Sequence, residues 1–516
     1  LGRVQRVWRL CRRHPRESIL SLLVFSAIVV GGLGVGWQWL RAESNLQRAT
    51  RNFELLDRAA DEMLVVVEEW VTRTPPRTEA QQQRLSSSLR LFEAFLNEEP
   101  ANRAARRRLA ETHARVAEIR RLLRQLDRAA HHFREAVRIF HELNELEAEP
   151  DLQLELARAL DDLGNVEREA GHFEAAGAAF EETLKILRAE VNPSDTARMQ
   201  AELSRALYNR GLLRFEQNQA DAAEADFVES IAASERALAV EPGSLEYRQG
   251  LARCRINLGV LLRNVGRSRD CLQQYTDAIQ QLRELVQQQP SESEFGVELS
   301  QALLNLGNLL LSARTETPPL APDSLAEAAG AFESAVQLLE QLTGEYPNVP
   351  LYHIQLASAL NGVGGVQQER EELAAAEQSW QRAKVAFERV LSLSGESADV
   401  RSRLGLTLSN LALLVPKEQS ERKLPLLQEA CEQQRMALRM TPDAAPIRGY
   451  LRSHLLSLAR ACLLVGRFSQ AVTAALELEQ LAVQRGDGRL AADLLVRSAV
   501  GIGADESLSA EEREAR

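Results

Sequence analysis

The sequence predicts an all-α chain in which a single transmembrane helix precedes a right-handed α-solenoid of about seven helical hairpins. Three observations support this fold class. A repeat of 47 or 48 residues runs through most of the chain, and an uncharged stretch, residues 18–40, lies ahead of it. Ala, Leu, Glu, Arg and Gln dominate the composition, and no run of alternating β-branched residues bounded by turns is present.

The repeat is marked by one small residue in each copy. One interval between copies is 57 residues, which indicates an inserted loop. Because self-similarity at one period fixes the architecture, this pattern outranks every local motif. The small residues are Ala117, Gly164, Gly211, Gly259, Gly307, Gly364, Ala412 and Ala459.

A second small residue and an aromatic follow in the same register. The second small residue comes 12 positions after the first, and the aromatic four positions later; in the fifth copy the pair is displaced to Ala328 and Phe332. Copies close at proline or glycine, which end helices. The other aromatics are Phe133, Phe180, Phe227, Tyr275 and Trp380.

Each copy is therefore predicted to be two antiparallel helices. Small residues at two facing positions allow close approach of the helix backbones, and the aromatic fills the space beside them. One hairpin cannot bury its own apolar face, so successive hairpins are expected to stack.

This spacing resembles the tetratricopeptide repeat (TPR), and Asn305-Leu306-Gly307-Asn308 is similar to the core of that family's first helix. The resemblance covers residues 101–488. The family has a period of about 34 residues, so both helices are expected to be longer here by about two turns, or roughly 10 Å. HEAT-type repeats, with a period of about 40–47 residues, are the alternative, although they do not explain the small and aromatic spacing.

The N-terminal part predicts a membrane protein. Residues 1–17 carry six arginines and one glutamate and form a basic cytoplasmic segment, and residues 18–40 are long enough, at about 34 Å, to span a bilayer. The distribution of arginines places the N-terminus in the cytoplasm and the repeats outside, as in a single-pass protein of a bacterial cytoplasmic membrane. A cleaved signal peptide and a buried soluble helix are the alternatives.

Residues 41–73 are predicted to form a charged linker helix with an apolar seam. The helix either pairs with a second copy as a parallel coiled coil, giving a homodimer, or packs alone on the first hairpin. Residues 79–99 are expected to cap the array as a half-repeat. The seam residues are Leu46, Ala49, Phe53, Leu56, Ala60, Met63, Val67 and Trp70.

Three further features complete the organisation. Insertions at 312–324 and 415–424 are either binding loops or surface excursions. Residues 489–516 are expected to form a capping helix and a flexible tail. Cys254 and Cys271 are either buried thiols or a disulfide, and their register favours thiols.

No catalytic motif is found, and no catalytic, cofactor-binding or metal-binding residues are assigned. Nucleotide-binding loops and the signatures of protein kinases are absent from the sequence. His113, His131, His132 and His141 lie near one another, and surface histidines are preferred to a metal site. The net charge is −11, and −16 beyond residue 17 because residues 1–17 contribute +5, which argues against nucleic acid as a partner.

What remains is binding. The resemblance to TPR proteins implies that first helices line a groove for a protein or peptide, at positions −3, +1 and +4 from the small residue. The alternative is that these side chains only pack the lengthened helices. The predicted groove residues are Tyr208, Leu212, Phe215, Ile256, Val260, Arg263, Leu304, Asn308 and Leu311.

A second resemblance concerns residues 7–45. An arginine-rich segment, one membrane helix and helical repeats resemble the C-terminal half of bacterial transmembrane serine/threonine protein kinases. The sequence begins at Leu1 rather than methionine, so an upstream kinase domain is one expectation. Two functions stand: a membrane-anchored interaction scaffold with a protein or peptide partner, or the sensor and dimerisation half of such a kinase.

Overall fold

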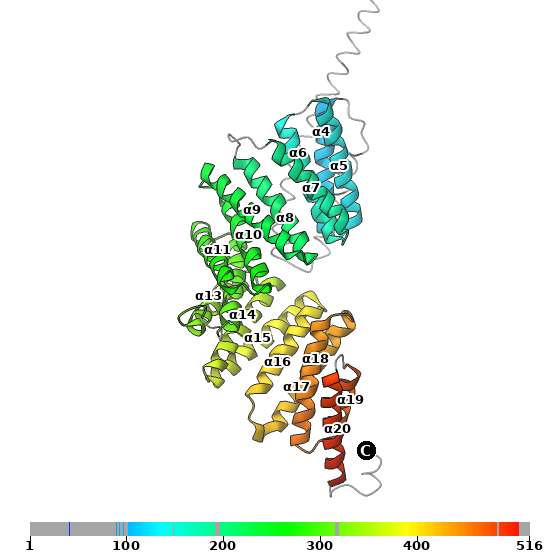
Figure 1. Cartoon of the computed structure of the whole chain (residues 1–516), viewed down its shortest axis with the longest axis vertical. Helices are drawn as coiled ribbons and strands as arrows, with labels where there is room; N and C mark the ends of the chain where they lie inside the picture. The colour runs from blue at the N-terminus through cyan, green and yellow to red at the C-terminus, as the bar shows by residue number, and fades with distance from the viewer. Residues whose placement is uncertain are drawn as a thin grey trace, which may run out of the picture. The chain divides into compact units, whose positions relative to one another are not determined.

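The fold is seen in a computed structural model, which describes residues 102–147, 149–190, 197–314, 319–481 and 485–504, with four isolated positions before them: Arg41, Leu89, Phe92 and Leu96. These residues form seventeen α-helices, labelled α4 to α20, one short 3₁₀ turn and no strands (Figure 1). The predicted all-α class is therefore confirmed for the described part of the chain.

The helices come in pairs joined by short connections. Prolines and a glycine lie in several of these connections: Pro242, Pro290, Pro347, Gly395 and Pro442. The helix bounds are α4 Arg103–Leu122, α5 Leu126–Leu146, α6 Pro150–Glu169, α7 Phe173–Glu190, α8 Ala197–Glu216, α9 Ala220–Val240, α10 Leu245–Asn264, α11 Ser268–Gln288, α12 Ser293–Ser312, α13 Ser324–Glu345, α14 Pro350–Glu369, α15 Leu373–Ser394, α16 Ala398–Leu414, α17 Ser420–Met440, α18 Ala445–Leu464, α19 Phe468–Gln480 and α20 Arg485–Ala504.

The described residues fall into two compact units. The first, which ends at Leu152, contains the hairpin of α4 and α5, whose Ala117, Ala129 and Phe133 are all buried. Within the predicted capping half-repeat, Leu89 and Phe92 belong to one apolar cluster with two buried residues of α4.

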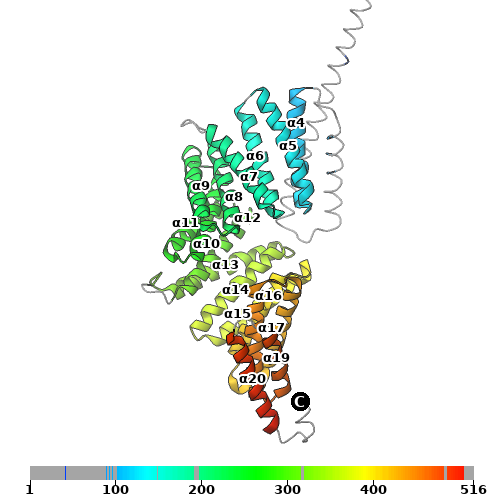
Figure 2. The ribbon, with the colours of Figure 1, turned by 45° about the vertical axis from the view of Figure 1, so that its right-hand side comes forward.

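The second unit begins at Gln153 and holds the remaining hairpins. From α8 onward, each second helix packs against the first helix of the next hairpin, and neighbouring helices lie side by side in both views (Figure 2). The helices from α8 to α15 are 20 to 22 residues long. This confirms the predicted lengthening, and the eight hairpins of the two units exceed the predicted number by one.

Five hairpins are closed by contacts between a glycine and an aromatic ring, as the spacing predicts. A Cβ atom added at Gly259 would lie 2.4 Å from Cε1 of Tyr275, and one added at Gly211 would lie 2.8 Å from Cε1 of Phe227. These distances are far below van der Waals contact, so only glycine lets the two helices approach this closely. The same contact joins Gly164 to Phe180, Gly307 to Phe332 and Gly364 to Trp380.

The inserted segments differ from each other. Between α12 and α13, Leu320 and Ala321 pack onto the core, and Ala321 is buried. Between α16 and α17 the insertion is shorter than predicted, because α17 already begins at Ser420 after a 3₁₀ turn at Lys417–Gln419. The buried thiols are confirmed: Cys254, Cys271, Cys431 and Cys462 are free and enclosed.

The predicted localisation is not supported. No helix among the described residues combines the length and apolar composition that a bilayer-spanning helix needs. The single-pass membrane localisation, with a cytoplasmic N-terminus and extracytoplasmic repeats, is therefore withdrawn. The segments on which it rested, residues 1–17 and 18–40, lie outside the described residues, as does the predicted dimer seam from Leu46 to Trp70.

The glycine–aromatic contact predicts that Gly259→Ala lowers stability. The new methyl group would overlap the Tyr275 ring, and such overpacking costs about 1–3 kcal/mol. The matched control is Gly250→Ala on the same helix, where an added Cβ meets nothing within 4 Å; it should stabilise the protein by about 0.5–1 kcal/mol. Urea unfolding followed by circular dichroism gives both values, and equal effects of the two substitutions would contradict the packing account.

Candidate functional site

Four of the nine predicted groove residues form one half-buried apolar strip. Tyr208, Leu212 and Phe215 of α8 and Val260 of α10 pack against the same core cluster and keep part of their surface exposed. We call these four residues the apolar strip. They lie on successive first helices, as the register predicts.

The other five groove residues divide between core and surface. Ile256 and Leu304 are buried and belong to a core cluster, so they pack the helices rather than face a ligand. Leu311 and Arg263 are half-buried, and Asn308 is exposed. The residue three positions before the small residue is therefore partly exposed on α8 (Tyr208) and buried on α10 and α12 (Ile256 and Leu304).

Asparagines two positions before the glycine bridge neighbouring first helices. Nδ2 of Asn257 donates to the Tyr208 hydroxyl at 3.0 Å, and Nδ2 of Asn209 donates to Oδ2 of Asp161 at 2.8 Å. This role was not predicted from the sequence. The Asn-x-Gly triplet marks it at residues 209–211 and 257–259, whereas the same triplet at 305–307 has its asparagine bonded to Gln301 of its own helix.

A charged ladder joins the first helices α6, α8, α10 and α12, and its members on α8 and α10 lie nearer the helix starts than the strip does. Nη1 of Arg205 contacts Oδ1 of Asp162 at 3.0 Å and Oδ2 of Asp161 at 3.4 Å. Arg253 pairs with Glu294 at 2.6 Å and with Glu298. We call the following residues the charged ladder: Arg158, Asp161, Asp162, Glu202, Arg205, Arg253, Glu294 and Glu298.

Two ladder carboxylates, Asp161, which is buried, and Glu298, which is half-buried, are incompletely bonded. Burial raises the pKa of Asp161 to about 7, against the opposing charge of Arg205, and Oδ1 of Asp161 has no hydrogen-bond partner among the described atoms. Burial also raises the pKa of Glu298, whose Oε2 is likewise without a partner there, although Arg253 and Gln249 bind Oε1.

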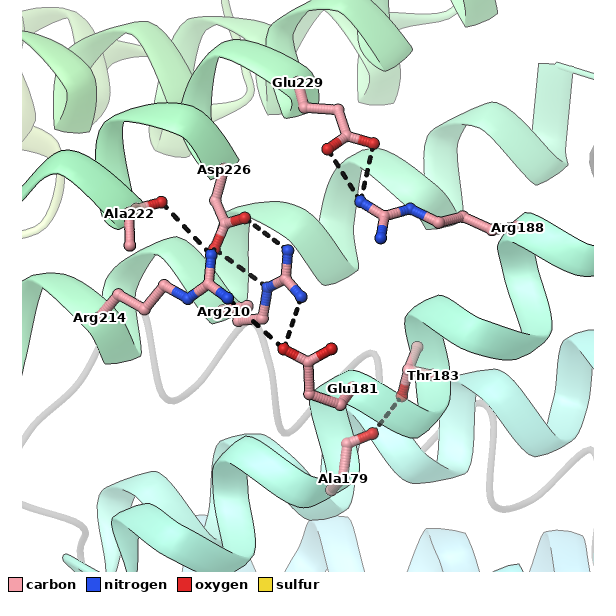
Figure 3. Close-up of polar contacts among 9 residues, drawn as sticks. All are labelled: Ala179, Glu181, Thr183, Arg188, Arg210, Arg214, Ala222, Asp226 and Glu229. Atoms are coloured by element: carbon pink, nitrogen blue, oxygen red, sulfur yellow. Dashed lines mark hydrogen bonds and ion pairs between the residues drawn. The ribbon is translucent and has the colours of Figure 1, made fainter. Parts of the chain in front are cut away.

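A second polar cluster ties three helices together away from the strip. Figure 3 shows Arg210 and Arg214 of α8 between Asp226 of α9 and Glu181 of α7. Arg210 binds both oxygens of Asp226, at 3.0 and 2.6 Å, and contacts Glu181 at 2.7 Å.

This cluster replaces an apolar contact of the repeat. Arg210 and Asp226 are both buried, and they stand at the register positions that Leu163 and Ala179 occupy in the preceding hairpin. A buried ion pair at one hairpin only distinguishes that hairpin from its neighbours, because a shifted pairing would leave both charges uncompensated.

Two histidines of the first unit lie against each other. Nδ1 of His113 lies 3.1 Å from Nδ1 of His132, and burial lowers the pKa of both, that of His132 to about 4. No group of three metal-ligating side chains is found in the part of the chain that the structure describes.

Comparison with known proteins gives similarity of fold. No family model and no curated protein matches the sequence. Among solved structures, the apo quorum sensor NprR from B. thuringiensis is 11% identical, with a TM-score of 0.46 over 85% of this chain and 99% of that chain. Apo RapI is 14% identical, with a TM-score of 0.43 over 76% of this chain and 97% of that chain.

A third similar structure is TTC0263, a thermophilic TPR protein of Thermus thermophilus. It is 22% identical, with a TM-score of 0.30 over 49% of this chain and 99% of that chain. These neighbours are TPR-like helical repeat proteins, and none of the comparisons shows a link to a protein kinase.

We expect that Arg210 and Asp226 can be replaced by leucine and alanine, the residues at the same register positions in the preceding hairpin. Asp226→Ala alone strands a buried guanidinium and should cost roughly 3 kcal/mol, whereas Arg210→Leu with Asp226→Ala should restore stability to within about 1 kcal/mol of the parent. Urea unfolding of the single and double variants measures the cycle. A double variant no better than Asp226→Ala would show that the site cannot accept apolar packing.

Asp161 should make stability fall as pH rises. Its pKa is raised when folded, so the folded chain binds a proton more tightly than the unfolded chain, and this contribution is lost between the ordinary carboxyl pKa and about 7. Asp162 of α6 and Glu202, Arg205 and Asn209 of α8 face the group. Asp161→Asn removes the titration, so its stability relative to the parent should rise by about 1–3 kcal/mol from pH 5 to pH 8.

Urea unfolding at the two pH values measures this change, and constant costs of the substitution cancel in the difference. A relative stability that is equal at pH 5 and pH 8 would mean that Asp161 does not titrate in this range.

Proposed function

We propose that the chain is a non-catalytic interaction scaffold, and that the apolar strip is the surface on which it holds a protein or peptide segment. The observation that carries the proposal is the strip itself. Three apolar side chains at positions 208, 212 and 215 follow one face of α8, and Val260 continues them on the next first helix. Partly exposed aromatic and aliphatic side chains gathered on one face are typical of interaction surfaces.

The strip is held in a fixed conformation. The Tyr208 ring lies 6.1 Å from that of Phe227, which is itself fully buried against Gly211, and the Tyr208 hydroxyl accepts a hydrogen bond from Asn257. Ion pairs of the charged ladder join α8 to α6 and α10 to α12. Preorganised side chains lose little entropy on binding, which favours affinity for a short segment.

The proposal predicts that Leu212→Glu weakens segment binding. A display library of random 16-residue peptides is selected on the parent protein, and affinities of the enriched peptides are then measured by fluorescence anisotropy. A buried charge in the interface should weaken binding at least about tenfold, or 1.4 kcal/mol.

The matched control is Val228→Glu, because Val228 of the second helix α9 is 51% exposed and lies outside the strip. It should leave the affinities unchanged. Failure to enrich any peptide, or equal loss in the two variants, would rule out the strip as the binding surface.

A further inference from the structure

We infer that the segment held by the apolar strip is amphipathic and basic, with lysine or arginine along the edge that meets the charged ladder. This inference rests on the proposed function of the strip and adds the chemistry of the partner. It follows from three features of the ladder: its charge, its position and its incomplete internal pairing.

The charge of the ladder is unbalanced. It contains five carboxylates and three guanidinium groups, so with all of them ionised it carries two net negative charges. The carboxylates are Asp161, Asp162, Glu202, Glu294 and Glu298, and the guanidinium groups are Arg158, Arg205 and Arg253.

The guanidinium groups contact carboxylates that differ widely in exposure. Arg205 contacts Asp161 and Glu202, whose side chains are 1% and 12% exposed, and Arg253 contacts Glu298, which is 15% exposed. The carboxylates at the outer edge are far more open, at 39% for Asp162 and 49% for Glu294. These two carboxylates, which also pair with Arg205 and Arg253, are therefore the negative charges of the ladder that a partner reaches most easily.

Hydrogen bonding shows the same imbalance. Oδ1 of Asp161 and Oε2 of Glu298 are buried without a partner among the described atoms, so the arginines do not saturate the carboxylates they bind. A cation bound to Asp162 or Glu294 would take over part of the ion pairing that Arg205 or Arg253 now gives that carboxylate. The arginine could then pair more strongly with Asp161 or Glu298.

The ladder and the strip adjoin at Tyr208. The Asn257 amide that binds the Tyr208 hydroxyl also binds the carbonyl oxygen of Arg253 at 3.0 Å, and the charges of Arg253 and Glu298 act on the pKa of Tyr208, which burial raises to about 12. A segment whose apolar side chains cover the strip thus places one edge within reach of the ladder.

The opposite edge has a different charge. Arg263, half-buried, lies about one turn beyond Val260 on the far side from Arg253. A second row of cations there would be repelled. The complementary segment therefore carries its positive charge on one edge only, and this fixes the direction in which it lies.

The test uses three synthetic 18-residue amphipathic peptides with one leucine face and a single charged edge made of lysine, glutamine or glutamate. Fluorescence anisotropy measures their affinity for the parent protein. The lysine peptide should bind about three- to tenfold more tightly than the glutamine peptide, because two partly exposed charge pairs are gained, and the preference should shrink in high salt. The glutamate peptide should bind most weakly.

A double variant, Asp162→Asn with Glu294→Gln, should lose the preference for lysine, so that it binds the lysine and glutamine peptides with equal affinity. The matched control is Glu229→Gln with Glu340→Gln, which removes two partly exposed carboxylates from the second helices, where they pair with Arg188 and Arg382. It changes the net charge equally and should keep the preference.

Four outcomes would overturn the inference. A glutamate peptide that binds most tightly would indicate an acidic partner that uses Arg263. Equal loss of preference in the two double variants would indicate attraction to overall charge only. If all three peptides bind equally and Leu212→Glu weakens them all, the strip is the binding surface but the ladder takes no part in recognition. If no peptide binds, both the proposed function and this inference are wrong.

Discussion

The close approach of two helices at a glycine is the constraint on which five consecutive hairpins, from α6–α7 to α14–α15, depend. Where Gly211, Gly259 or Gly307 meets the ring of its partner helix, an added methyl group would overlap ring atoms. The ring is then completely buried, and its apolar surface stabilises the pair of helices. Glycine weakens an isolated helix, so its presence at mid-helix indicates that packing outweighs propensity here.

Polar contacts determine which hairpin packs against which, whereas the glycine–ring contacts are the same in several hairpins. The repeated glycine and aromatic contacts are interchangeable, and they alone would let hairpins pair in shifted order. Asn257 with Tyr208, Asn209 with Asp161 and Arg210 with Asp226 occur once each and are buried or half-buried, so each joins one specific pair of helices. The same bonds fix Tyr208 beside the charged ladder, and thereby couple the framework to the proposed binding surface.

Much of the fold can be predicted from the sequence, because the residues that pack the helices recur at the same spacing in each repeat. The period, the two small residues and the aromatic predict the hairpins and their closest contacts. The candidate site was less predictable: position −3 is Tyr208 in one hairpin and buried Leu304 in another, since exposure depends on how neighbouring helices tilt. The Arg210–Asp226 pair is visible in the sequence only as two polar residues in apolar register, and charge alone does not identify a partner at 16 residues' distance.

The glycine–ring contact can be observed directly by nuclear magnetic resonance of the protein labelled with ¹³C-glycine. The hydrogen on each packed glycine that occupies the place of a Cβ lies against an aromatic ring, so the Hα resonances of Gly164, Gly211, Gly259, Gly307 and Gly364 should show large ring-current shifts. Gly243, Gly250 and Gly330, around which an added Cβ meets nothing within 4 Å, should resonate at ordinary positions. Indistinguishable shifts in the two sets would contradict the account.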